Sequence, residues 1–153
     1  MSRRPIVAVS LLTVLAVSAV PASAATHKRP KPIKGSYTLS LPPDPSGEAV
    51  GALKDGCAGL LPTSKDNHPF TVPAAGTLHV VLDSTAVTHN STQDADWDLY
   101  VLDPDGTIED SSHSPTPHEE TTDKFKRRTS LAFEVCNLLG APSAKVTYTF
   151  TYA

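Results

Sequence analysis

Apolar and polar residues alternate in several short segments of this chain, which is the two-residue period of strands with one buried face. The clearest segment is the last, in which Val146, Tyr148, Phe150 and Tyr152 alternate with threonines. The same period recurs in shorter segments at residues 36–41, 70–72, 77–82, 97–102 and 131–136. About seven short strands with almost no helical period predict an all-β fold, a jelly-roll-like antiparallel β-sandwich.

Turn residues between these segments support the same interpretation. Asp103-Pro104-Asp105-Gly106 has the composition of a tight type I turn, so Thr107 and Ile108 should begin a returning strand. Residues 48–62 are rich in glycine and are predicted to form a loop. Residues 110–126 show little periodicity, so we expect an exposed connection there with at most a short edge strand.

The N-terminal residues have the pattern of an export signal. Arg3 and Arg4 precede an apolar run at residues 6–20, and Ala22-Ser23-Ala24 supplies small residues for cleavage. A retained membrane helix is the alternative, but the run is short for spanning a bilayer, and no other segment is a candidate span. We therefore expect a secreted protein with three parts. These are a signal peptide at 1–24, a basic proline-rich linker at 25–34 and a single β-sandwich domain at 35–153.

The charge balance argues against nucleic acid as a partner. The formal net charge of the chain is −3, and removing Arg3 and Arg4 with the signal peptide makes the remainder more acidic. Phosphate binding requires a basic surface, whereas the basic clusters here are short, at residues 27–34 and 124–128.

Cys57 and Cys136 are the only cysteines of the chain. An even pair in an exported protein indicates a disulfide. A zinc site, a redox dithiol or a thiol nucleophile is the alternative, but the two cysteines lack the close spacing that the first two require. Closing a loop of this length would stabilise the fold by roughly 4 kcal/mol, and strain in the folded state would reduce this gain.

Three segments together resemble the bacterial pre-peptidase C-terminal domain. They are Phe70-Thr-Val-Pro-Ala-Ala-Gly-Thr-Leu78, Asp96-Trp-Asp-Leu-Tyr-Val-Leu-Asp-Pro-Asp-Gly106 and the closing Thr147-Tyr-Thr-Phe150. The resemblance covers residues 70–153 and is most specific in the hairpin at 98–106. It implies a non-catalytic jelly-roll-like sandwich, usually attached to secreted peptidases and sometimes used to bind matrix or to hold calcium. The present chain resembles a stand-alone form with one disulfide.

Five aspartates form the candidate calcium site. Carboxylate and carbonyl oxygens gathered at a loop are the ligands that calcium prefers. The candidate ligands are Asp94, Asp96, Asp98, Asp103 and Asp105. The alternative is that Asp94 and Asp96 are solvated and that Asp103 and Asp105 bond their own turn amides. An EF-hand is excluded, since Leu99 occupies the position that needs glycine.

Aromatic and histidine side chains supply two further candidate sites. Trp97 and Tyr100 could form an aromatic platform for a ligand, although alternating aromatics such as Trp97 and Tyr148 are more often core residues. A second candidate is a zinc site in the predicted connection at 110–126, although a solvated loop is the favoured interpretation there. Its candidate ligands are His113, His118, Glu119 and Glu120.

No catalytic motif is present among the hydrolase, metalloprotease, phosphate-loop and dinucleotide patterns. We therefore expect a secreted, non-catalytic binding or accessory module whose ligand is an extracellular protein or polysaccharide. One alternative is a calcium-stabilised structural or interaction protein of the cell envelope. Another is a small hydrolase or inhibitor, which would need titratable groups clustered in a pocket.

Overall fold

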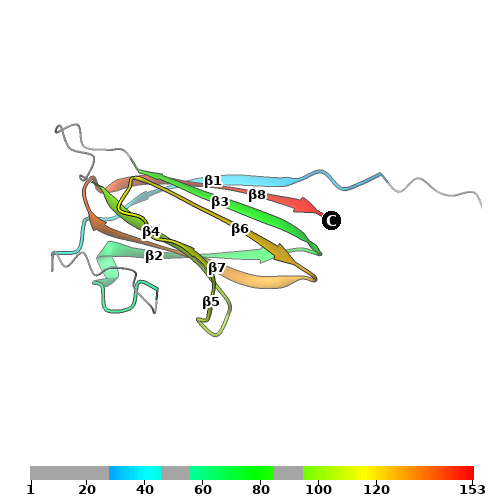
Figure 1. Ribbon diagram of the computed structural model, residues 1–153, viewed down its shortest axis with the longest axis horizontal. Helices are drawn as coiled ribbons and strands as arrows, with labels where there is room; N and C mark the ends of the chain where they lie inside the picture. The colour runs from blue at the N-terminus through cyan, green and yellow to red at the C-terminus, as the bar shows by residue number, and fades with distance from the viewer. Residues whose placement is uncertain (1–27, 46–55, 85–94) are drawn as a thin grey trace, which may run out of the picture.

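The computed structural model describes residues 28–45, 56–84 and 95–153. Within these ranges, eight strands form two antiparallel four-stranded sheets that pack face to face (Figure 1). Sheet 1 has the order β1 (Ile33–Ser40), β8 (Ser143–Tyr152), β3 (Gly76–Ser84), β6 (His118–Phe125). Sheet 2 has the order β2 (Lys65–Val72), β7 (Thr129–Leu139), β4 (Asp96–Leu102), β5 (Ile108–Ser112). This order is that of an eight-stranded jelly roll and confirms the predicted fold.

The core lies between the two sheets and is built from alternate residues of the strands. Trp97, Phe133 and Phe150 are its largest fully buried apolar side chains. Partly buried rings, including Phe70 and Tyr148, pack against it; their centroids are 5.0 Å apart. Because one face of each strand supplies the core, the other face of sheet 1 is left to polar side chains.

Sheet 2 differs because a second apolar cluster covers its outer face. Cys57 is joined to Cys136 of β7, which confirms the predicted disulfide. Leu60 and the 3₁₀ turn η1 (Pro62–Ser64) follow Cys57 along the chain. The cluster consists of Cys57, Leu60, Tyr100, Leu102, Cys136 and Leu138. Strand β4 is consequently buried on both faces, with Leu99 in the core and Tyr100 in this outer cluster.

Hydrogen bonds fasten residues 56–64 to the sheet beneath them. The Cys57 amide donates to the Glu134 carboxylate at 2.9 Å, and the Leu61 amide donates to the Asp44 carboxylate at 2.8 Å. Lys65 donates from Nζ to the Cys57 carbonyl at 3.2 Å. Charge-assisted bonds of this kind are stronger than neutral ones, so the disulfide is not the sole attachment.

The sequence prediction for residues 110–126 is only partly right: an edge strand is present, but β6 occupies 118–125 and β5 extends to Ser112, so most of the segment is strand and not connection. The inward-facing residues of β6 are Glu119, Thr121, Asp123 and Phe125. Three of the four are polar, so the usual apolar alternation is missing. Inward polar residues on an edge strand are a known defence against pairing with another chain.

The ends of the predicted segments are only partly described. The predicted signal peptide at 1–24 lies outside the described residues, and β1 begins at Ile33, two residues before the predicted domain boundary. Among the residues that the structure describes, no helix is long and apolar enough to cross a membrane.

Candidate functional site

Strand β4 separates the five aspartates that were considered as calcium ligands. Asp96 and Asp98 lie at its beginning, and Asp103 and Asp105 follow its end. A strand of this length extends about 20 Å, so these two pairs cannot hold one ion. Asp94 lies outside the described residues. Within the described ranges, no group of three or more His, Cys, Asp or Glu side chains is arranged to hold a metal ion.

The turn after β4 behaves as the alternative interpretation expects. Asp105 accepts a hydrogen bond from the Thr107 amide at 3.0 Å, and this bond lowers the pKa of its carboxyl group. The Gly106 amide donates to the Asp103 carbonyl at 2.9 Å, and Gly106 has a φ of 87°, which favours glycine. These contacts close a tight turn between β4 and β5.

Both residues of the predicted aromatic platform are buried. Trp97 is 0% exposed and lies in the core, and Tyr100 is 1% exposed and lies in the outer cluster of sheet 2. Neither ring reaches the surface, which corrects that candidate site and agrees with the alternative that Trp97 is a core residue. Trp97 is buried between the sheets, and Tyr100 is buried because residues 56–64 cover sheet 2, which the alternation of β4 alone does not reveal.

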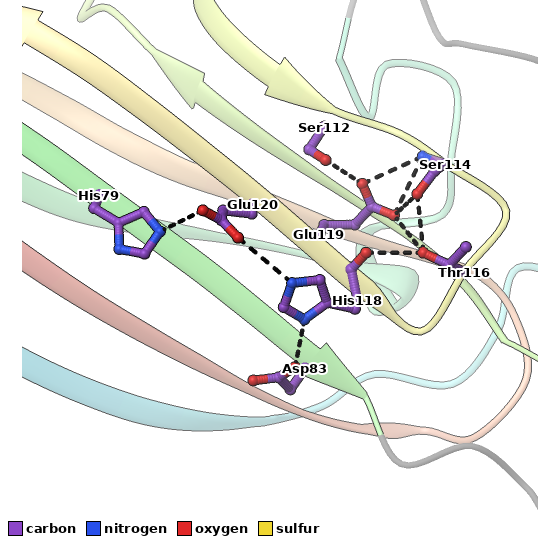
Figure 2. Close-up of polar contacts among 8 residues, drawn as sticks. All are labelled: His79, Asp83, Ser112, Ser114, Thr116, His118, Glu119 and Glu120. Carbon is purple, nitrogen blue, oxygen red and sulfur yellow. Dashed lines mark hydrogen bonds and ion pairs between the residues drawn. The ribbon is translucent and has the colours of Figure 1, made fainter.

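Glu119 is a fully buried carboxylate that organises the connection between β5 and β6 (Figure 2). It accepts hydrogen bonds from the hydroxyl groups of Ser112, Ser114 and Thr116, and from the Ser114 amide at 3.2 Å. A buried carboxylate with this many donors is well compensated for lost hydration. We interpret it as a structural residue that shapes the loop.

The candidate zinc ligands do not face a common point. His118 and Glu120 point to the outer face of sheet 1, and Glu119 between them points inward. On the outer face, His79 contacts Glu120 at 2.8 Å and His118 contacts Asp83 at 2.7 Å, while 3.7 Å separates His118 from Glu120 (Figure 2). Asp83 raises the pKa of His118, and His79 lowers the pKa of Glu120. These are exposed pairs, whose contribution to stability is small.

A cavity of about 250 Å³ opens where the β4–β5 turn meets the β6–β7 turn, and we call it the turn-end pocket. Its lining residues are Asp103, Glu109, Lys124, Phe125, Lys126, Arg127 and Thr129. Asp103 lies beside Glu109 in this lining, and its carboxyl group raises the pKa of Glu109. In the described part of the chain, the ion pairs are formed by histidines, so the three cations of the pocket have no carboxylate partner.

Sequence reasoning found the components of the turn-end pocket but not their arrangement. The basic run at 124–128 and the turn at 103–106 are both visible in the sequence, about twenty residues apart. The jelly-roll order places their strands at neighbouring edges of the two sheets, and β5 and β6 contact each other. Glu109 was not identified, because an exposed glutamate next to a turn has no distinguishing pattern.

Comparison with solved structures finds fourteen similar chains, including the following two. No family model and no functionally described protein matches the chain. The crystal structure of a mitogen from Yersinia pseudotuberculosis has a TM-score of 0.40 and 14% identity, over 81% of this chain and 87% of that one. The crystal structure of the VP2 subviral particle of infectious bursal disease virus has a TM-score of 0.33 and 9% identity, over 90% of this chain and 37% of that one. Neither adds to what the strand order shows.

Proposed function

We propose that this protein is a secreted, non-catalytic binding module that attaches to a polymer outside the cell, either a polysaccharide or a protein. The turn-end pocket is the observation that supports this most directly. Three cations and two carboxylates line one surface cavity, and no ion pair between these cations and a carboxylate is formed among the described residues. Cations that line a surface cavity in this way are available to an anionic ligand.

The position of the pocket on the fold supports the same function. It is formed by turns at the end of a two-sheet frame whose strands pair antiparallel, with register shifts only at Asp96/Trp97 and Val101/Leu102 among these pairings. Loops held by a rigid sandwich are where recognition is commonly found. The frame itself is strengthened by the Cys57–Cys136 disulfide, a bond typical of oxidising compartments outside the cytoplasm.

The non-catalytic part of the proposal is supported by the placement of the buried acids. Asp98 and Glu119 are 2% and 0% exposed, and each accepts a hydrogen bond from a side chain of the protein itself. Buried acids engaged in this way are unavailable to a substrate, whereas an active-site acid needs access to one.

A calcium-stabilised protein is the second candidate function, and Asp96 and Asp98 support it. Burial raises the pKa of both carboxyl groups, and the charge of Asp96 raises that of Asp98 further. Neutralisation by a cation would relieve this cost. Thermal unfolding with calcium and with a chelator tests the idea, because an ion bound to the folded state raises the melting temperature. Equal melting temperatures would refute it.

Co-sedimentation with insoluble extracellular polymers tests the main proposal. The oxidised protein is mixed with cell-wall polysaccharide, with surface protein and with an inert matrix, and the bound fraction is measured. We expect saturable binding to one polymer that Arg127→Gln weakens, while the exposed Lys145→Gln on sheet 1 has no effect. Binding to none of these polymers would contradict the proposal.

A further inference from the structure

The turn-end pocket contains opposite charges, and this mixture restricts the chemistry of its ligand. Lys124, Lys126 and Arg127 attract an anion, while Asp103 and Glu109 repel one. A plain anion would therefore gain from one side of the pocket and lose from the other. A ligand that carries hydroxyl donors beside its anionic group would satisfy both sides.

We infer that the turn-end pocket binds one acidic sugar unit of an anionic polysaccharide. The cations hold the carboxylate of the sugar, and the Asp103–Glu109 pair accepts hydrogen bonds from its hydroxyl groups. The inference rests on the proposed function and names its ligand. It also selects the polysaccharide over the protein as the extracellular partner.

The position of Asp103 next to Glu109 suits this role. Both side chains line the pocket, and Asp103 raises the pKa of Glu109. Each carboxylate accepts hydrogen bonds through two oxygens. The pair can therefore accept bonds from several hydroxyl groups of a sugar ring.

Size and an apolar surface favour a single sugar ring in the pocket. The volume of about 250 Å³ is below the roughly 300–1,000 Å³ of pockets for drug-sized ligands. Phe125 lines the pocket and packs against the core, so its ring is fixed and offers an apolar surface to the C–H face of a sugar. Thr129 adds a hydroxyl group at the rim.

A second cavity next to the first indicates a polymer rather than a free sugar. It has a volume of about 260 Å³ and shares Asp103 with the turn-end pocket. Asn67 and Ser130 supply polar groups there, and Leu102 and Ala132 supply apolar ones. Two cavities that share one lining aspartate would accept neighbouring units of a chain.

Binding of defined polymers to the oxidised protein tests this inference. The probes are oligogalacturonate as an acidic sugar chain, dextran as a neutral one and polyphosphate as an anion without hydroxyl groups. We expect oligogalacturonate to bind and dextran not to bind. Loss of one charge-assisted contact in Arg127→Gln should weaken oligogalacturonate binding about tenfold, and the control Lys145→Gln should not.

The variant Glu109→Gln separates sugar recognition from simple charge attraction. The amide replaces one acceptor oxygen with a donor group, so it accepts fewer bonds from hydroxyl groups, and it also removes a repulsive charge. We expect it to weaken oligogalacturonate binding and to strengthen polyphosphate binding. If Glu109→Gln strengthens both, the pocket is a general anion site and the inference is wrong.

Two other outcomes distinguish this inference from the proposed function. Binding to dextran or to a surface protein, unaffected by Arg127→Gln, would overturn the acidic-sugar site and leave a binding module. Binding to none of the polymers and proteins would overturn both. Each variant is compared with the parent protein by thermal unfolding, so that loss of folding is recognised separately.

Discussion

The Tyr100 hydroxyl donates a hydrogen bond to a carboxylate oxygen of Asp98 at 2.9 Å, although both side chains are buried. The two residues are neighbours on one face of β4, and Tyr100 packs in the outer cluster with Cys57 and Leu60 of the disulfide-held segment. Burial raises the pKa of Asp98 to about 6, and the bond from Tyr100 limits this rise. The outer face of sheet 2 therefore contains a titratable group that depends on its cover.

Removing the Tyr100 hydroxyl should destabilise the protein more at pH 7 than at pH 4. Tyr100→Phe leaves the ionised Asp98 carboxylate without this donor, at a cost of about 1–3 kcal/mol. At pH 4 Asp98 is protonated in the folded state, so removing the Tyr100 hydroxyl lowers the free energy of unfolding by less. Denaturant unfolding at both pH values measures the difference, with Tyr152→Phe as a control. Equal losses at the two pH values would contradict the role assigned to this bond.

Stability should fall as the pH rises from about 4 to about 6. The pKa of Asp98 is 3.8 in its ordinary state and about 6 in the folded protein, so the folded state holds this proton more tightly. The resulting stabilisation is complete below the unfolded pKa and is lost as the pH passes the folded one. Asp123 behaves similarly, since burial and the charge of Asp110 raise its pKa to about 6.

Asp98→Asn should flatten this pH dependence in part. The amide oxygen still accepts the bond from Tyr100, but no proton is taken up in the acid range. We expect the variant to be more stable than the parent at pH 7 by about 1–3 kcal/mol, and no more stable at pH 4. Asp123→Asn provides the matched comparison. A parent protein whose stability does not change between pH 4 and pH 7 would refute the buried-acid description.

Opening the disulfide should uncover the outer cluster of sheet 2. The double variant Cys57→Ala and Cys136→Ala removes a closure across 79 residues. We expect a fall of about 10–15 °C in the melting temperature, corresponding to roughly 4 kcal/mol. Reductant should lower the melting temperature of the parent protein in the same way and leave that of the variant unchanged. A parent that is insensitive to reductant would show that the hydrogen bonds of Cys57 and Leu61 hold the segment alone.

Glu119→Gln should loosen the connection between β5 and β6. The amide replaces one acceptor oxygen with a donor group, which then faces the hydroxyl and amide donors of Ser112 and Ser114. We expect the free energy of unfolding to fall by about 2–3 kcal/mol. Faster hydrogen exchange at the Ser114 amide would locate the effect. The neighbouring, exposed Glu120→Gln should cost less than about 1 kcal/mol. Similar costs for both variants would argue against a special role of the buried carboxylate.

Most of the sandwich could be predicted because its central strands alternate apolar and polar residues. Strand β8 is the clearest example, and its register with β1 and β3 keeps Val146 and Phe150 in the core. The extent of strand β6 was missed because polar residues occupy its inward positions. In β2, Pro69 interrupts the pattern, which an edge strand tolerates because one side needs no ladder hydrogen bonds.

The candidate sites were harder to predict, because they depend on contacts between distant segments. The alternation of β4 places Tyr100 on the face that should be exposed. A segment about forty residues earlier in the chain buries it. Asp96 and Asp105 are close in sequence and are separated by the length of a strand. Glu109 and Arg127 are far apart in sequence and line one cavity. Such distances are set by topology, which local patterns do not encode.

Backbone amide chemical shifts, recorded during titration with oligogalacturonate, test the proposed binding function most directly. We expect the shifts that change to cluster at residues 103–109 and 124–129, with a midpoint that Arg127→Gln moves to higher ligand concentration. Changes on the outer face of sheet 1, around His79 and Glu120, or no changes at saturating ligand, would contradict the assignment of the turn-end pocket as the binding site.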